Sequence, residues 1–123
     1  MRLRTISRVE VKDNYVFRTL RGLRIQDVGH SVLHTPSLVT NNLINETLES
    51  GIYCASGSYA FNDSSSYGCR HILITGNRLK NCFNNGILVI GSKHVEVTNN
   101  IILNSANAPI QQWSGCDNLY KNN

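Results

Sequence analysis

The sequence predicts an all-β chain wound into a coil of parallel strands, about five turns long, with three short strands in each turn of about 23 residues. Two observations predict this fold. An asparagine recurs at one place in a degenerate repeat, and apolar residues alternate with polar residues on both sides of it. An apolar spacing of two is typical of strands, whereas an amphipathic helix requires spacings of three and four. The recurring residues are Asn14, Asn42, Asn77, Asn100 and Asn123, of which the last three are spaced 23 apart.

The first strand of each turn precedes the asparagine, in the pattern apolar-x-apolar-x-x-Asn. Weaker copies keep only the apolar residue nearer the asparagine, as at Val39 and Tyr120. We expect the apolar side chains to point into the coil. The full pairs are Val9 and Val11, Ile72 and Ile74, and Val95 and Val97.

The asparagine marks the bend that ends the first strand. Asparagine tolerates the left-handed backbone region better than most residues, so the sequence predicts that conformation at the recurring position. Its amide can also hydrogen-bond the equivalent amide one turn away. We therefore expect a structural ladder of asparagines rather than a set of catalytic residues.

The second and third strands follow at fixed distances. An apolar residue comes two positions after the asparagine, and glycine or proline with an apolar residue comes eight or nine positions after it. Stacking such turns about 4.8 Å apart buries a continuous core that no single turn could bury. Cys54 falls in an apolar column and is expected to fill this core. The strand openings are Gly22-Leu23, Gly51-Ile52, Gly86-Ile87 and Pro109-Ile110.

Length and charge restrict the possible functions. A chain of 123 residues forms a single domain, and it contains neither an apolar run long enough to span a membrane nor the apolar segment of a secretory signal. Residues 1–24 carry a net charge of +5 and the remainder carries −1. The basic end is either a binding surface for an acidic polymer, such as nucleic acid or an anionic polysaccharide, or an ordinary solvated surface.

The four cysteines do not indicate a zinc site, because they lack its characteristic spacing. Their number does not decide their disulfide state. They are Cys54, Cys69, Cys82 and Cys116.

The segment "ILITGNRLKNCFNNGILVIGSKHVEVTNNIILNSANAPI" resembles the right-handed parallel β-helix repeats of the pectate-lyase-like superfamily. In style it is similar to the repeats of mannuronan epimerases and of periplasmic copper-maturation β-helix proteins. The resemblance extends over residues 9–123 and implies a single-stranded right-handed parallel β-helix. It does not specify the chemistry, because this fold carries lyases, hydrolases, epimerases, phage tailspikes and adhesins.

Two insertions, at 26–36 and 55–70, lengthen the same corner of neighbouring turns. In the family that the chain resembles, the strand before this corner forms the floor of the saccharide cleft. Strand alternation places one row of residues outward on this floor and a second row one step further along. The first row is Arg24, Tyr53, Leu88 and Gln111, and the second is Gln26, Ala55, Ile90 and Trp113.

The outward rows contain no carboxylate, which disfavours a hydrolase with two flanking carboxyl groups. A lyase or epimerase instead needs a cation for the uronate carboxylate and a group that transfers the adjacent proton. We expect Arg24, Tyr53 and His30 in the catalytic roles, with ordinary surface residues as the alternative. The epimerase signature Asp-Pro-His does not occur. The expected substrate-binding residues are Gln26, Asp27, Asp63, Gln111 and Trp113, of which Trp113 would stack on a sugar.

His71, His94 and Asp117 are spaced 23 apart and form one column, which is either a metal site or a solvent-facing turn. The solvent-facing turn is the prediction, so no cofactor is assigned, and no motif specifies a calcium ion. The expected partners are an acidic polysaccharide or another glycan and a second copy of the chain, bound through uncapped ends or an apolar strip of Leu88, Ile90 and Trp113. The 55–70 loop is the first candidate to cover this strip, before a partner chain or stacked sugar rings. Nucleic acid and membrane are not expected partners.

The sequence therefore predicts a carbohydrate-active domain spanning residues 1–123 that binds, and by a lyase or epimerase route modifies, an acidic polysaccharide. The alternative is a non-catalytic glycan-binding or structural module, such as a phage tailspike, an adhesin or a periplasmic scaffold. We expect the chain to be a piece of a longer coil or to be capped by self-association. As a piece of a secreted family member it would be extracellular or periplasmic.

Overall fold

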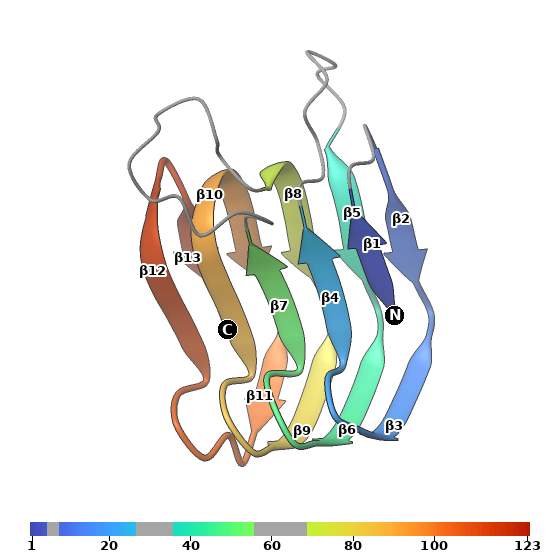
Figure 1. Ribbon diagram of the computed structural model, residues 1–123. Coiled ribbons are helices and arrows are strands. Elements are labelled where there is room, and N and C mark those ends of the chain that lie inside the picture. The colour runs from blue at the N-terminus through green and yellow to red at the C-terminus, as the bar shows by residue number, and fades with distance from the viewer. Residues whose placement is uncertain (5–7, 27–35, 56–68) are drawn as a thin grey trace.

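The computed structural model describes residues 1–4, 8–26, 36–55 and 69–123, and every paired strand in this part of the chain runs parallel to its partners. The chain winds into a coil with three faces. On each face, a strand pairs with the equivalent strand of the next turn (Figure 1). The predicted all-β parallel coil is confirmed. Within the described residues, no helix is long and apolar enough to cross a membrane.

Each of the four complete turns in the described residues contributes one strand to each of three faces, as predicted, and β1 and β13 belong to incomplete turns at the two ends. The first face contains β2 (Glu10–Lys12), β5 (Ser37–Thr40), β8 (Arg70–Thr75), the second half of β10 (Ile87–Thr98) and β13 (Leu119–Lys121). The second face contains β3 (Tyr15–Thr19), β6 (Leu43–Thr47), β9 (Arg78–Cys82) and β11 (Ile101–Leu103). The third face contains β1 (Arg2–Arg4), β4 (Leu23–Gln26), β7 (Ile52–Ala55), the first half of β10 and β12 (Ile110–Cys116).

Strand β10 departs from the prediction of short separate strands. It continues without interruption from the third face of one turn into the first face of the next. Gly91, with a φ of 54°, lies at the corner within this strand and permits the bend. The equivalent corner residue in the following turn, Ser114, also has a positive φ of 46°.

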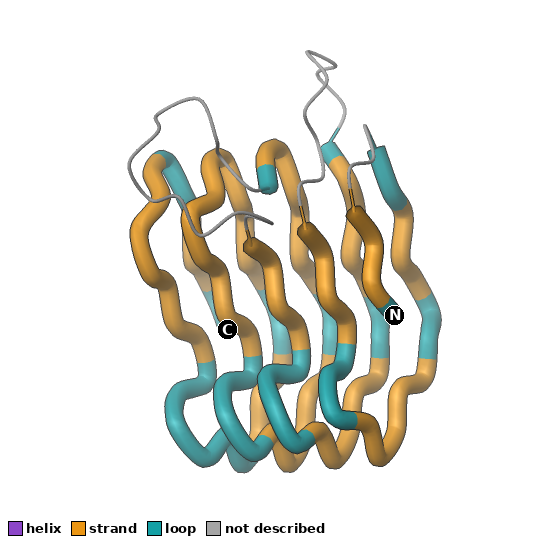
Figure 2. Tube along the Cα trace, in the orientation of Figure 1, coloured by secondary structure: helices purple, strands orange, loops and turns teal. Residues whose placement is uncertain are grey.

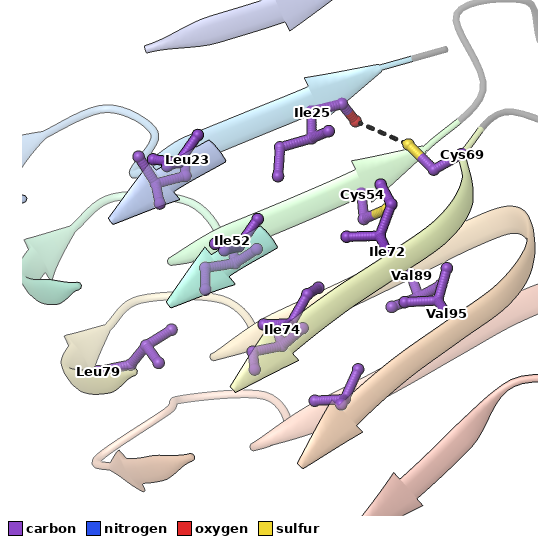
Figure 3. Packing of buried hydrophobic residues seen from close by; sticks show 14 of the residues in the cluster. Leu23, Ile25, Ile52, Cys54, Cys69, Ile72, Ile74, Leu79, Val89 and Val95 are labelled. Carbon is purple, nitrogen blue, oxygen red and sulfur yellow. Dashed lines mark hydrogen bonds between the residues drawn. The ribbon is translucent and has the colours of Figure 1, made fainter. Parts of the chain in front are cut away.

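The interior of the coil is filled by the predicted apolar columns. The second strands contribute Ile44 and Leu79, both 0% exposed, with Val16 and Ile102 packed against the same cluster at its ends. Side chains from the first and third strands meet them from the other sides (Figure 3). Cys54 is also 0% exposed within this cluster, which confirms that it fills the core.

The asparagine ladder is confirmed over the whole described coil. The backbone N–H and the side-chain Nδ2 of Asn42 both donate to Oδ1 of Asn77, at 3.0 and 2.9 Å. The same pair of bonds joins each ladder residue to the next. From the second turn onward, Nδ2 of each ladder asparagine also donates to a backbone carbonyl in the first strand of the preceding turn. For example, Nδ2 of Asn77 donates to the carbonyl oxygen of Val39 at 2.8 Å. Each ladder amide within the coil, such as that of Asn42, donates two hydrogen bonds and accepts two, whereas the hydroxyl of serine or threonine has only one proton to donate.

The prediction that the ladder asparagines adopt the left-handed conformation is wrong. The positive φ belongs to the residue immediately before each of them, with values between 52° and 66°. That residue makes the bend, and the N–H and side chain of the following asparagine are then aligned with the neighbouring turns. The residues concerned are Asp13, Asn41, Gly76, Asn99 and Asn122.

The glycines that open the third strands are required by close stacking between turns. A Cβ on Gly51 would lie 2.9 Å from the carbonyl oxygen of Gly86, and a Cβ on Gly86 would lie 2.5 Å from that of Pro109. On Gly22 it would collide with the carbonyl oxygen of Gly51. Loop segments of consecutive turns lie side by side at this corner, along the lower edge of the view in Figure 2. The Gly-apolar pairs therefore mark backbone contact between consecutive turns.

Candidate functional site

The candidate site is the outer side of the third face, where the structure assembles the predicted row. Arg24 on β4 is in register with Tyr53 on β7, Tyr53 with Leu88 on β10, and Leu88 with Gln111 on β12. At the other end of the row, Arg2 on β1 occupies the register position next to Arg24. Adjacent members of such a row lie about 4.8 Å apart, so the row runs along the coil axis.

Arg24 and Tyr53 form the best-defined contact in the row. The guanidinium carbon of Arg24 lies 5.0 Å from the centre of the Tyr53 ring, within the range of a cation–π interaction. Both side chains are partly exposed. The Nε–H of Arg24 is buried and makes no hydrogen bond within the described structure. Buried donors without a partner are rare in folded proteins.

Gln111 and Trp113 lie at the far end of this face, on β12. Trp113 is 52% exposed and available for stacking. Oε1 of Gln111 accepts a hydrogen bond of 3.4 Å from Nδ2 of Asn107. The next strand, β10, separates both residues from Tyr53. The structure therefore brings Arg24 and Tyr53 into contact but leaves Trp113 two strands from Tyr53.

Four residues of the two predicted outward rows are buried, which makes the prediction of an accessible second row wrong at Gln26 and leaves the apolar strip covered at Leu88 and Ile90. Gln26, Ala55, Leu88 and Ile90 are all in the predicted register but are between 1% and 8% exposed. Ala55, Leu88 and Ile90 form an apolar cluster of their own, separate from the interior core, against which Tyr53 packs. Of the predicted strip, only Trp113 is exposed.

The described strands of the third face carry positive charge and no carboxylate. Arg2, Arg4 and Arg24 stand on β1 and β4, and none of the five strands contains Asp or Glu. In β10 this statement refers to the half that belongs to this face, residues 87–92. Three predicted site residues, Asp27, His30 and Asp63, lie outside the described residues.

His71 and His94 of the histidine column lie on the first face, in β8 and in the second half of β10. The rings of His71 and His94 stack with their centres 4.8 Å apart and an interplanar angle of 17°, and both residues have a positive φ. Beside them is a cavity of about 270 Å³ whose lining includes Glu96. Asp117 continues the column and lies 3.6 Å from Nζ of Lys93. Among the residues the structure describes, no three His, Cys, Asp or Glu side chains are placed to hold a metal ion.

An exposed apolar surface that was not predicted from the sequence covers the second face and the corner that follows it. Here Tyr15 and Phe17 stack with ring centres 5.9 Å apart, and the Arg18 guanidinium lies 4.7 Å from the Phe17 ring centre. The signal was present in the sequence as apolar residues at equivalent places in consecutive turns. We call this surface the second-face patch; its residues are Tyr15, Phe17, Leu20, Leu43, Leu48, Phe83, Ile101 and Leu103, each at least 40% exposed.

Part of the second-face patch is hollowed. A cavity of about 360 Å³ is lined by the apolar corner residues of three consecutive turns, Leu20, Leu48 and Phe83, together with the ion pair between Arg18 and Glu46. Phe83 is 72% exposed. Soluble proteins rarely leave a contiguous apolar surface of this kind uncovered, so it is a candidate contact surface.

Comparison with known proteins identifies the family of the chain but no activity. Searches of curated proteins and of solved structures gave no match. A family model described as "Right handed beta helix region" matches residues 34–123. That range contains four of the five ladder asparagines and most of the stacked turns. The chain belongs to the right-handed β-helix family.

Proposed function

We propose that this chain is a carbohydrate-binding β-helix domain whose third face binds an acidic polysaccharide. The observation that carries the proposal is the guanidinium of Arg24 over the Tyr53 ring, on a face whose described strands carry arginines and no carboxylate. A face of this composition attracts anions and does not repel them. Neutral glycans would bind less tightly, because they carry no negative charge for the arginines to attract.

In the proposed complex the polysaccharide lies along the row, parallel to the coil axis. The carboxylate of one uronate unit binds the guanidinium of Arg24, because arginine forms strong charge-assisted hydrogen bonds with carboxylates. Gln111 hydrogen-bonds a hydroxyl further along the chain, and Trp113 stacks on the apolar face of a sugar ring. Tyr53 holds the guanidinium in place from beneath.

The proposal extends to lyase or epimerase chemistry at the same place. Both reactions remove the proton beside the uronate carboxylate, and a cation on that carboxylate stabilises the negative charge that develops. Arg24 would supply this charge. Tyr53 lies beside it as a group that could transfer a proton, and His30 is the other candidate named by the sequence. The hydrolase route has no support on this face, since it needs two carboxyl groups.

Replacing Arg24 by glutamine is expected to weaken binding of polygalacturonate or alginate at least tenfold, because one charge-assisted contact contributes about 1.5–3 kcal/mol. Affinity would be measured by isothermal titration calorimetry at two salt concentrations, and the parent protein should bind less tightly at the higher one. Absorbance of unsaturated sugar products in the same mixtures tests lyase activity.

The matched control is Arg78→Gln, which removes the same charge from β9 on the second face. This variant should bind as the parent protein does. Circular dichroism would verify that both variants keep the strand signal. Equal affinity of the Arg24→Gln variant and the parent, or equal binding of neutral dextran, would contradict the proposed site.

The alternative function is a structural module that assembles with a second copy of itself, and the second-face patch favours it. Charge alternates across this surface from turn to turn. A two-fold axis between the second and third turns would bring the acidic side chains of one copy against the basic side chains of the other, with the apolar residues covered between them. In turn order, the charged residues are Arg18 and Arg21, then Glu46 and Glu49, then Arg78 and Lys80.

We expect the parent chain to sediment as a dimer and the Leu48→Lys variant as a monomer, because an unpaired charge would be buried in the interface. Leu48 is 65% exposed, so the change should not affect the core. Leu119→Lys is the control, since Leu119 is 49% exposed but lies on β13 of the first face. A monomeric parent protein at all concentrations would refute self-association through this surface.

A further inference from the structure

Cys54 and Cys69 both belong to the interior core cluster and their thiols are in contact, although fourteen residues separate them in the sequence. Sγ of Cys69 lies 3.6 Å from the carbonyl oxygen of Ala55 and 3.4 Å from that of Ile25 (Figure 3). The hydroxyl of Ser92 touches both cysteines, at 4.0 Å from Sγ of Cys54 and 3.4 Å from the backbone nitrogen of Cys69. Both residues are 0% exposed.

The strand register explains why these two positions meet. Cys54 on β7 is paired with Val89, and the pairing of Arg70 with Lys93 places Cys69 opposite Ser92. In the following turn, Val89 and Ser92 are separated by only residues 90–91 across one corner of the coil. In the turn of the cysteines the same corner is interrupted by residues 55–68. The two thiols therefore mark the two ends of an insertion.

We propose that Cys54 and Cys69 form a disulfide that ties together the two ends of the 55–68 insertion. Each thiol contributes one sulfur to the new bond. The oxidant is a small-molecule disulfide such as oxidised glutathione, which accepts two electrons and the two thiol protons and leaves as two thiols. Both cysteines are thiols in this structure, as is Cys82.

The environment indicates when the bond forms. Contact with the thiol of Cys69 and complete burial raise the pKa of Cys54 well above its ordinary value. The thiolate is the species that attacks a disulfide, so exchange in the folded protein is slow. Oxidation should therefore occur while the chain folds, before the thiols become buried.

The test is to refold the full chain in a glutathione redox buffer and, separately, in excess reductant. After the remaining thiols are alkylated, cleavage on the carboxyl side of aromatic residues puts Cys54 and Cys69 in different peptides, because Tyr59, Phe61 and Tyr67 lie between them. We expect a linked peptide pair from the oxidised sample only. The bond should raise the melting temperature by about 10 °C, because it restricts a loop of this length in the unfolded chain.

Two variants keep the fold while removing the pair. Cys54→Val and Cys69→Ser introduce the residues that the next turn has at the equivalent positions, Val89 and Ser92. Each should abolish both the linked peptides and the redox-dependent shift in melting temperature. The Cys82→Ser/Cys116→Ser double variant should retain both. Full alkylation of Cys54 and Cys69 after oxidative refolding, or linkage of either to Cys82 or Cys116, would overturn the proposal.

Discussion

Replacing Asn77 by alanine is expected to destabilise the protein by about 4 kcal/mol, since several buried polar groups lose their partners at once and each costs about 1–3 kcal/mol. Asn77 is 1% exposed. Without its Oδ1, the N–H and Nδ2 of Asn42 lose the acceptor that both now use. Without its Nδ2, the carbonyl of Val39 and Oδ1 of Asn100 lose a donor. Urea unfolding followed by circular dichroism would measure the change.

The control for this prediction is Asn84→Ala. Asn84 is exposed, and its side chain accepts a single hydrogen bond of 3.4 Å from Asn107, another exposed residue. Its loss should cost less than about 0.5 kcal/mol, as is usual for surface substitutions. If the two variants unfold at the same urea concentration, the ladder contributes no more to stability than an ordinary surface asparagine.

The ladder shows what the repeat could predict and what it could not. The ladder position is always asparagine, because a single side chain there must accept two hydrogen bonds and donate others. The position before it is Asp, Asn or Gly in every turn, the residues that best tolerate a positive φ. Comparing the two columns would have assigned the bend to the earlier position. The tolerance of asparagine for the left-handed region is not decisive by itself, because the residue before it tolerates the same conformation.

The candidate site was predicted less completely than the fold, because exposure is not periodic. Alternation correctly placed Arg24, Tyr53 and Gln111 in one outward row. It could not reveal that Leu88 and Ile90, in the same outward positions, are buried in a second cluster. A side chain's exposure depends on what else packs on that face, and strand periodicity contains no information on this. The second-face patch is a different case, because its apolar residues recur at equivalent places in consecutive turns and a comparison of those columns would have identified it.

Replacing Gly86 by alanine should destabilise the protein by about 3 kcal/mol, because overpacking against an immobile neighbour costs about 1–3 kcal/mol and sometimes more. The new Cβ would lie 2.5 Å from the carbonyl oxygen of Pro109, in the turn above, and would also meet the Ile102 side chain. Neither Gly86 nor Gly51 has a positive φ, so the loss would arise from the spacing of the turns and not from backbone conformation. Thermal and urea unfolding would measure it.

Gly76→Asn is the matched control. It tests the effect of backbone conformation, whereas Gly86→Ala tests the effect of a steric clash between neighbouring turns. Gly76 has a φ of +66°, but the equivalent residues in the other turns are Asp or Asn with similar φ values. The nearest atom to a Cβ there is Oδ1 of Asn41, at 2.6 Å, the end of an exposed side chain that can move. We expect a change within about 1 kcal/mol, since the residue restricts the unfolded chain but tolerates the bend. A larger loss for Gly76→Asn than for Gly86→Ala would mean that the bends, and not the contact between carbonyl and glycine, limit how closely the turns stack.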